Sequence, residues 1–207
     1  MPGSLALHVG NLLGCAQLRD TPLVSHHRQK RKLRTMITNM QVKPLGDDST
    51  YREGRVYCKP WDTEIDVSLY EEDVTLEYAE KCAEAMNSMP QELIDTICRA
   101  AKLFCLEFFD AISDEWRAEL SHAVPVDKDT PPAEMMKHFR PYALVVEPPA
   151  DPSRIGYQLA CNCAWEEEHG MEIDVLDGKL VYLCEYGGES PWDNHTDEEW
   201  NYALRVQ

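Results

Sequence analysis

Residues Tyr157–Gly188, YQLACNCAWEEEHGMEIDVLDGKLVYLCEYGG, decide the fold of this 207-residue chain. Apolar and polar side chains alternate over residues 171–176 and again over residues 179–184, which is the period of a half-buried β-strand. Asp177-Gly178 separates the two runs and suits the positive φ angles of a type I′ turn. The pattern therefore predicts a two-residue β-hairpin with these cross-strand pairs: Val175 with Leu180, Ile173 with Tyr182 and Met171 with Cys184.

The preceding residues extend the same pattern by one strand. Side chains on one face of this run are apolar or weakly polar: Tyr157, Leu159, Cys161, Cys163 and Trp165. The side chains between them point to the opposite face, because successive residues of a strand alternate. Three consecutive strands with short connections are expected to form an antiparallel meander with one buried face.

Two amphipathic helices are predicted upstream of the meander. The first has Asp73 or Thr75 as its N-cap, and its apolar stripe recurs at helical spacing through Leu76, Ala79, Cys82, Ala83, Met86 and Met89. Ser88-Met89-Pro90-Gln91 has the form of a capping box, so a second helix is expected to begin there. Apolar residues cover more than half of the second helix between Leu93 and Phe109, which predicts the central buried helix of the fold.

The remaining segments complete the fold class. Val56–Tyr70 indicates two strands interrupted at Pro60. A short third helix is expected after Ser113, one or two helical turns after Thr130, and an apolar strand over Tyr142–Val146. We therefore predict an α+β fold in which an antiparallel sheet, made of the C-terminal three-stranded meander and N-terminal strands, packs against a helical layer with one central buried helix.

Charge is distributed unevenly along the chain, whose formal net charge is −17. Residues 1–40 contain six Lys or Arg side chains and one acid, a charge of +5, so residues 41–207 carry −22. Such an acidic body argues against nucleic-acid binding and favours a basic protein partner, although a solvated acidic surface also serves solubility alone. We predict that 1–40 is a flexible or mis-assigned extension, with a basic interaction arm as the alternative, and that 41–207 is a single α+β domain.

Neither an export signal nor a membrane-spanning segment is predicted. The apolar stretch Leu5–Ala16 is interrupted by polar residues and has no Lys or Arg before it, unlike a signal peptide. No run approaches the roughly 20 apolar residues of a spanning helix. Eight cysteines without export indicate a reducing compartment and free thiols, so we expect a cytoplasmic protein that does not bind a membrane.

Cysteine and histidine residues of the meander are candidate metal ligands or catalytic groups. Cys161 and Cys163 would need a bulge to share one zinc ion, because residues i and i+2 of a strand lie about 6.6 Å apart whereas zinc-bound thiolates lie roughly 3.8 Å apart. A nucleophilic pair would join Cys163 or Cys184 to His169 or His195, but burial raises the pKa of a thiol. We predict no catalytic residue, no metal and no cofactor, with a metal-dependent enzyme or zinc-binding protein at Cys161, Cys163 and His169 as the alternative.

The loop between the first two strands of the meander is strongly acidic. It reads Glu166-Glu167-Glu168-His169 and ends at Gly170, where a positive φ is expected to turn the chain. Its carboxylates suit a basic protein partner, and nearby aromatic side chains are typical anchors of interfaces. The predicted partner-binding residues are Trp165, Glu166, Glu167, Glu168, His169, Tyr186 and Trp192.

Several of these motifs together resemble a bacterial family of uncharacterised domains. The resemblance rests on Asn162–Gly170 with its Trp and Glu-His-Gly, on the following Asp177-Gly178-Lys179 and Tyr182, and on the helical segments 77–82 and 92–95. It spans roughly Val56 to Trp192 and leaves residues 1–40 outside. The resemblance implies an intracellular α+β binding domain without a known activity, and some relatives resemble immunity proteins that neutralise toxins of neighbouring bacteria. The three cysteines of the meander are not part of the family pattern.

Overall fold

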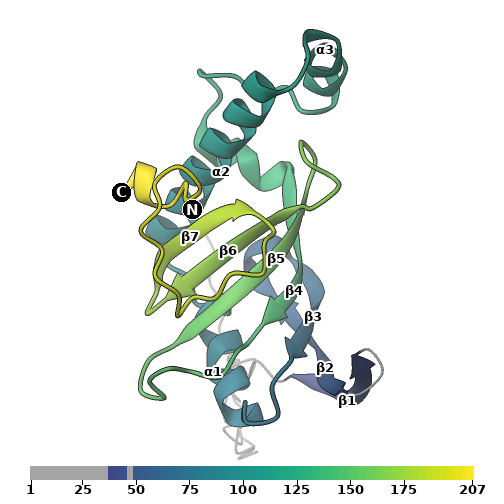
Figure 1. The fold of residues 1–207 in the computed structure, drawn as a ribbon, viewed down its shortest axis with the longest axis vertical. Helices are drawn as coiled ribbons and strands as arrows, with labels where there is room; N and C mark the ends of the chain where they lie inside the picture. The colour runs from purple at the N-terminus through teal and green to yellow at the C-terminus, as the bar shows by residue number, and fades with distance from the viewer. Residues whose placement is uncertain (1–36, 46–48) are drawn as a thin grey trace, which may run out of the picture. The chain divides into compact units, whose positions relative to one another are not determined.

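A computed structural model describes residues 37–45 and 49–207 of the chain, and its strands form one mixed sheet (Figure 1). The strands lie side by side in chain order: β1 (Thr38–Leu45), β2 (Ser49–Cys58), β3 (Thr63–Leu69), β4 (Phe139–Val145), β5 (Gly156–Cys163), β6 (Met171–Leu176) and β7 (Lys179–Glu185). All neighbouring pairs are antiparallel except β3 and β4, which are parallel. The apolar stretch Leu5–Ala16 and the alternative basic arm lie outside the described residues, and β1 begins within the segment assigned to the N-terminal extension.

Two of the α-helices, 76–87 and 91–111, lie against one face of this sheet, as the predicted fold class requires, whereas the third, 114–123, extends beyond the end of the sheet (Figure 1). The α-helices are α1 (Leu76–Asn87), α2 (Gln91–Ala111) and α3 (Asp114–Ala123), and the 3-10 helices are η1 (Lys59–Trp61), η2 (Pro132–Lys137) and η3 (Leu204–Val206). Thr75 caps α1, since its side chain accepts a hydrogen bond from the N–H of Tyr78 at 3.1 Å. Pro90 precedes α2 without a side-chain cap, so the predicted Ser88 capping box does not form.

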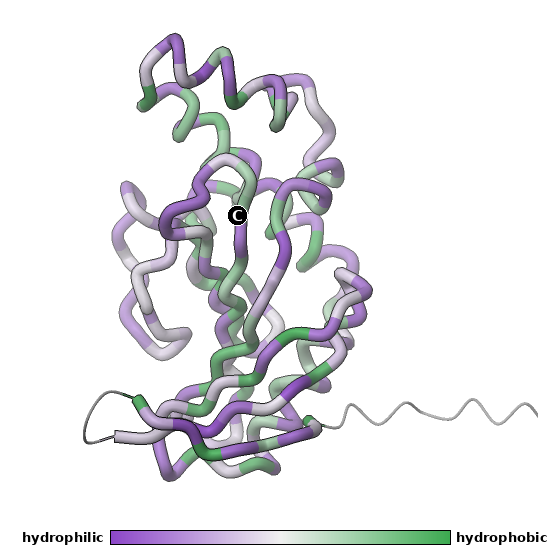
Figure 2. Tube along the Cα trace, turned by 90° about the vertical axis from the view of Figure 1, so that its right-hand side faces the viewer, coloured by the Kyte–Doolittle hydropathy of each residue, from purple (hydrophilic) through white to green (hydrophobic). Residues whose placement is uncertain are grey.

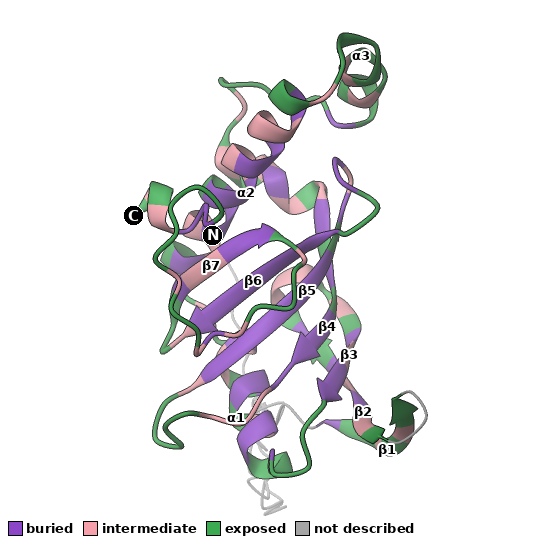
Figure 3. Ribbon diagram, in the orientation of Figure 1, coloured by how far each residue is buried: buried purple, intermediate pink, exposed green. Residues whose placement is uncertain are grey.

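The hydrophobic core lies between the helices and the covered face of the sheet. Figure 2 shows hydrophobic and hydrophilic segments alternating along the strands, and Figure 3 shows buried residues along β3 to β7 and α2. Leu159 and Ile173 of the meander and Ile97 of α2 are among the fully buried side chains. Burying each such side chain contributes about 1.5–3 kcal/mol. Buried residues run along α2 from Leu93 to Phe109, so its predicted role as the central helix is confirmed.

The hairpin forms as predicted at its turn and differs further along. Val175 pairs with Leu180, and both Asp177 (φ 50°) and Gly178 (φ 75°) have the expected positive φ. A register shift then follows between Asp174 and Val175, and Ile173 pairs with Leu183 instead of Tyr182. The expected pairs of Tyr182 and Cys184 are therefore wrong: Tyr182 lies opposite Asp174, and Cys184 lies opposite Glu172. One extra residue in β7 causes this change, because it reverses the facing of every residue beyond it.

A long C-terminal segment covers part of the opposite face of the sheet. Residues Gly187–Ala203, here called the C-terminal strap, cross in front of β6 and β7 in Figure 1. The N–H of Tyr202 donates to the carbonyl of Leu183 at 3.0 Å. Asn201 is fully buried, donates to the carbonyl of Val181 at 2.8 Å and accepts from the N–H of Leu183 at 3.3 Å. The strap therefore closes the free edge of β7 with hydrogen bonds.

Candidate functional site

The predicted acidic loop, Glu166–His169, is organised by a carboxylate that points inward. Glu166 is 6% exposed, and its carboxylate accepts hydrogen bonds from the N–H groups of Glu168, His169 and Gly170 at 3.2, 2.8 and 2.7 Å. Gly170 turns the chain with the expected positive φ of 76°. The first glutamate therefore shapes the loop, while Glu167, Glu168 and His169 are exposed.

Trp165 fixes the base of this loop. It is 2% exposed, and its ring makes edge contacts with Phe104 of α2 at 5.7 Å and with Phe139 of β4 at 6.4 Å between centroids. Such aromatic packing holds the start of the loop to the hydrophobic core. Trp165 and Glu166, both predicted to bind a partner, thus lie beneath the surface that Glu167, Glu168 and His169 present.

A possible metal-ligand group exists within the same loop. Ligand atoms of Glu166, Glu168 and His169 lie within 4.8 Å of one another. The carboxylate of Glu166, however, already accepts three backbone N–H groups, and the Nδ1 atom of His169 lies 3.3 Å from it. A cation could bind here only by competing with the hydrogen bonds that shape the loop.

The thiols of the meander do not join this group. Cys161 and Cys163 are buried in the core, and the Sγ atom of Cys163 donates to the carbonyl oxygen of Glu166 at 3.1 Å. Burial raises the pKa of Cys163 to about 12 and that of Cys184 to about 11, and it raises the pKa of Cys161 well above its ordinary value. Within residues 37–45 and 49–207, no cysteine belongs to a group of three convergent metal ligands.

The two remaining predicted anchors lie apart from one another. Tyr186 is half-buried just beyond β7, whose Glu185 pairs with Met171 at the end of the acidic loop. Trp192 is half-buried over Gly156, at the start of β5, whereas the acidic loop follows the end of that strand. Eight residues of strand separate these ends by about 23 Å. The structure therefore does not bring Trp192 to the acidic loop.

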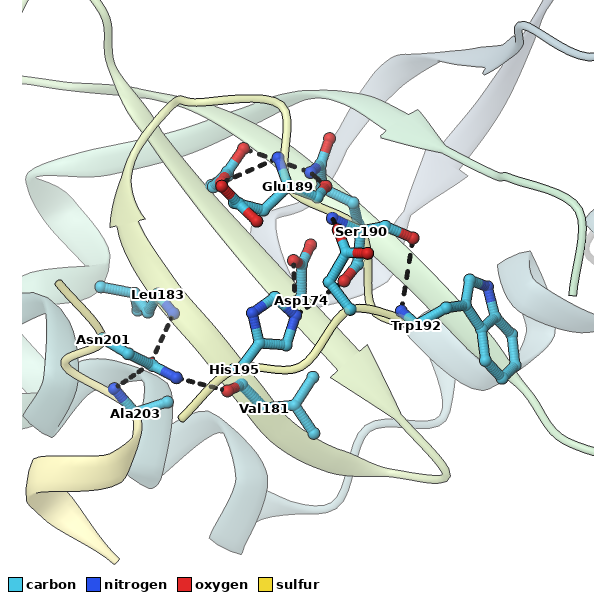
Figure 4. Close-up of polar contacts among 12 residues, drawn as sticks. Asp174, Val181, Leu183, Glu189, Ser190, Trp192, His195, Asn201 and Ala203 are labelled. Carbon is cyan, nitrogen blue, oxygen red and sulfur yellow. Dashed lines mark hydrogen bonds and ion pairs between the residues drawn. The ribbon is translucent and has the colours of Figure 1, made fainter. Parts of the chain in front are cut away.

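A second polar cluster lies beneath the C-terminal strap (Figure 4). Glu172 of β6 is fully buried, and it accepts hydrogen bonds from the N–H groups of Gly188 and Glu189 at 2.9 and 3.3 Å. The amide of Gln158 lies between Glu172, at 3.2 Å, and the carbonyl of Glu189, at 2.6 Å. Burial raises the pKa of Glu172 to about 7, although the backbone N–H groups act in the opposite direction.

Asp174 lies next to Glu172 on the same face of β6. It is fully buried, and neither carboxylate oxygen has a hydrogen-bond partner among the described residues. Burial and the neighbouring Glu172 raise the pKa of Asp174 well above its ordinary value. The imidazole of His195 lies over this carboxylate, stacks on Tyr182 at 4.8 Å and contacts the carbonyl of Ser190 at 2.7 Å (Figure 4).

The sequence placed Glu172 and Asp174 on the polar side of a strand and did not identify them as buried. Strand alternation predicts which side chains share a face and contains no information about a segment that later covers that face. The one local feature of the sequence that indicates a covering segment is the pair Gly187 and Gly188, whose backbone approaches Glu172. Both carboxylates are closed off from solvent, and Glu172 binds the strap through the N–H groups of Gly188 and Glu189.

The fold and these sites define an α+β domain with an acidic surface loop and a strapped sheet. The chain belongs to the family described as "Domain of unknown function (DUF6985)", which matches residues 41–190. No curated protein and no solved structure matches the chain. No helix within the described ranges combines the length and the apolar character needed to cross a bilayer.

Proposed function

We propose that this domain is a non-enzymatic protein-binding module whose acidic loop takes a basic protein partner in the cytoplasm. The observation that carries this proposal is the buried Glu166, whose carboxylate accepts hydrogen bonds from three backbone N–H groups of the loop. The side chains of Glu167, Glu168 and His169 face solvent. Trp165 anchors the same turn from below. A loop held in this way presents its charges with little loss of conformational entropy on binding.

The charge of the chain supports a basic partner. Residues 41–207 carry −22, and Glu167 and Glu168 form no ion pair within the described part of the chain. Complementary charge of this kind speeds association and selects against acidic partners. Buried thiols with raised pKa values give no support to a nucleophilic activity. An immunity-like role, in which the partner is a basic toxin of a neighbouring bacterium, is the specific form of this proposal.

Charge reversal on the loop tests the proposal. The double variant Glu167→Lys/Glu168→Lys is compared with Glu198→Lys/Glu199→Lys, which makes the same charge change on exposed residues of the strap. Wild type and the strap variant are expected to retain the same basic protein from a lysate of the source cells, and the loop variant is expected to lose it. The purified partner should then bind the wild-type domain at least tenfold more tightly than the loop variant in calorimetry.

Two results would contradict the proposal. One is equal retention of the partner by wild type and the loop variant. The other is loss of the partner in both variants, which would reflect net charge alone rather than this loop.

A further inference from the structure

A hollow of about 680 Å³ opens at one end of the sheet, where β3 and β4 separate. The two strands pair only over Asp66–Ser68 and Ala143–Val145, so their preceding residues diverge. The hollow lies between the residues that enter these strands, with the end of β5 on its other side. Its volume falls in the range of sites that hold small organic molecules.

One side of the hollow is apolar. Trp61 of η1 and Phe139 of β4 meet in an edge contact at 5.7 Å between ring centroids, and Met136 of η2 adds a flexible side chain. Cys163 also lines the hollow, as a neutral thiol with a pKa of about 12. Burial and the adjacent Lys137 lower the pKa of His138, which favours the neutral form of its imidazole. These surfaces suit an aromatic or aliphatic group.

Four formally charged side chains line the remainder of the hollow. Lys137 forms an ion pair with Glu134, and Asp62 accepts a hydrogen bond from the hydroxyl of Tyr57. Arg140 and Glu167 have neither an ion pair nor a side-chain hydrogen bond with any described residue, including each other. The hydroxyl of Tyr57 is neutral and leaves the charge of Asp62 in place, so among the described residues the hollow offers one cation without an ion pair, Arg140, and two carboxylates without one, Asp62 and Glu167, beside an apolar surface.

The charges without an ion pair restrict the ligand. Asp62 and Glu167 repel a simple anion, and Arg140 repels a simple cation, whereas a molecule with both charges complements Arg140 and a carboxylate. An arginine side chain also suits two-point hydrogen bonding to a carboxylate. We propose that the hollow binds a small zwitterion with an apolar body, of the class of aromatic or large aliphatic α-amino acids. The carboxylate contacts Arg140, the ammonium group contacts Glu167, and the side chain packs on Trp61 and Phe139.

Titration of the full chain with L-phenylalanine, L-tryptophan and L-leucine tests this site by calorimetry. At least one of them is expected to bind saturably at one site. For the tightest of the three, the analogue without the ammonium group and the analogue without the carboxylate should each bind at least tenfold more weakly. Absence of saturable binding by all three amino acids, or equal binding of either analogue, would overturn the proposal.

Variants locate the site. Arg140→Gln and Glu167→Gln are each expected to weaken amino-acid binding at least tenfold, and the matched changes Arg99→Gln and Glu84→Gln, on exposed helical residues, should leave it unchanged. In Arg140→Gln the analogue without a carboxylate should bind at least as tightly as it does to wild type, because it lacks the group that Arg140 contacts and its remaining positive charge is no longer repelled. Glu168→Lys lies outside the hollow and is expected to alter only protein binding, which separates this proposal from the acidic-loop proposal. Unchanged binding in Arg140→Gln would refute the assignment.

Discussion

The Nε2 atom of His195 lies 3.7 Å from the Oδ2 atom of Asp174, and this contact joins the C-terminal strap to the middle strand of the meander. The histidine side chain is 8% exposed and the aspartate side chain is completely buried. Glu172, two residues before Asp174 on β6, binds the same strap by accepting hydrogen bonds from the N–H groups of Gly188 and Glu189. The strap thus rests on two buried acids, a costly arrangement when both carry a charge.

The stability of the domain should depend on pH through Glu172. Burial raises its pKa from 4.5 to about 7, so the native state keeps this proton at pH values where the unfolded chain has lost it. The contribution of Glu172 to the free energy of unfolding is therefore largest below about pH 4.5 and is lost as the pH rises through 7. Relative to wild type, Glu172→Gln is expected to gain about 2 kcal/mol between pH 5 and pH 8.

Urea denaturation at several pH values measures this difference. Glu185→Gln, at an exposed position of β7, removes the same charge and serves as the control. The assignment to Glu172 fails if the difference between wild type and Glu172→Gln stays constant from pH 5 to pH 8.

Asn201 should be a principal attachment point of the strap. Its side-chain amide donates a hydrogen bond to the carbonyl of Val181. The amide oxygen accepts hydrogen bonds from the N–H groups of Leu183 and Ala203, the latter at 2.9 Å. Asn201→Ala leaves these buried groups without partners and is expected to lower the free energy of unfolding by about 2–4 kcal/mol. Asn194→Ala, on an exposed residue of the same strap, should change it by less than about 0.5 kcal/mol. Equal melting temperatures for the two variants would disprove this role.

Gly170 and Gly178 give a matched pair of substitutions. Both have a positive φ, of 76° and 75°, but a Cβ atom at Gly170 would collide with the carbonyl oxygen of Cys161, whereas nothing lies within 4 Å of one at Gly178. Gly178→Ala is expected to cost about 1–2 kcal/mol from backbone strain alone. Gly170→Ala should cost at least about 2 kcal/mol more and should disorder the acidic loop. Thermal denaturation compares the two, and similar losses would show that the loop tolerates the added methyl group.

The cysteines of the described domain should be unreactive. All seven are buried and free, and burial raises the pKa of Cys105 and Cys82 to about 12. In a Cys15→Ser variant, which removes the cysteine outside the described residues, a chromogenic disulfide reagent is expected to label native protein at least about 100-fold more slowly than urea-unfolded protein. Rapid labelling of Cys163 in the native state would instead indicate a reactive thiol.

Local features of the chain were predictable because neighbouring residues decide them. The Asp177-Gly178 turn, the Thr75 cap and the apolar stripe of α2 each follow from backbone geometry over a few residues. The strand β1 was missed, since its residues are mostly exposed and do not show a clear apolar alternation. The α+β class followed from the same periodicities and is confirmed by the sheet and its helical layer.

The sequence by itself determined the meander, its turn, the central helix and the acidic character of the chain. The tertiary structure alone decided that Glu172 and Asp174 are buried, because the strap that covers them comes from residues at least 13 positions further along the chain. The tertiary structure also creates the hollow beside Arg140, because this hollow exists only where β3 and β4 diverge. Periodicity assigns a side chain to one face of a strand, but its burial and charge state depend on the distant segments that pack against that face.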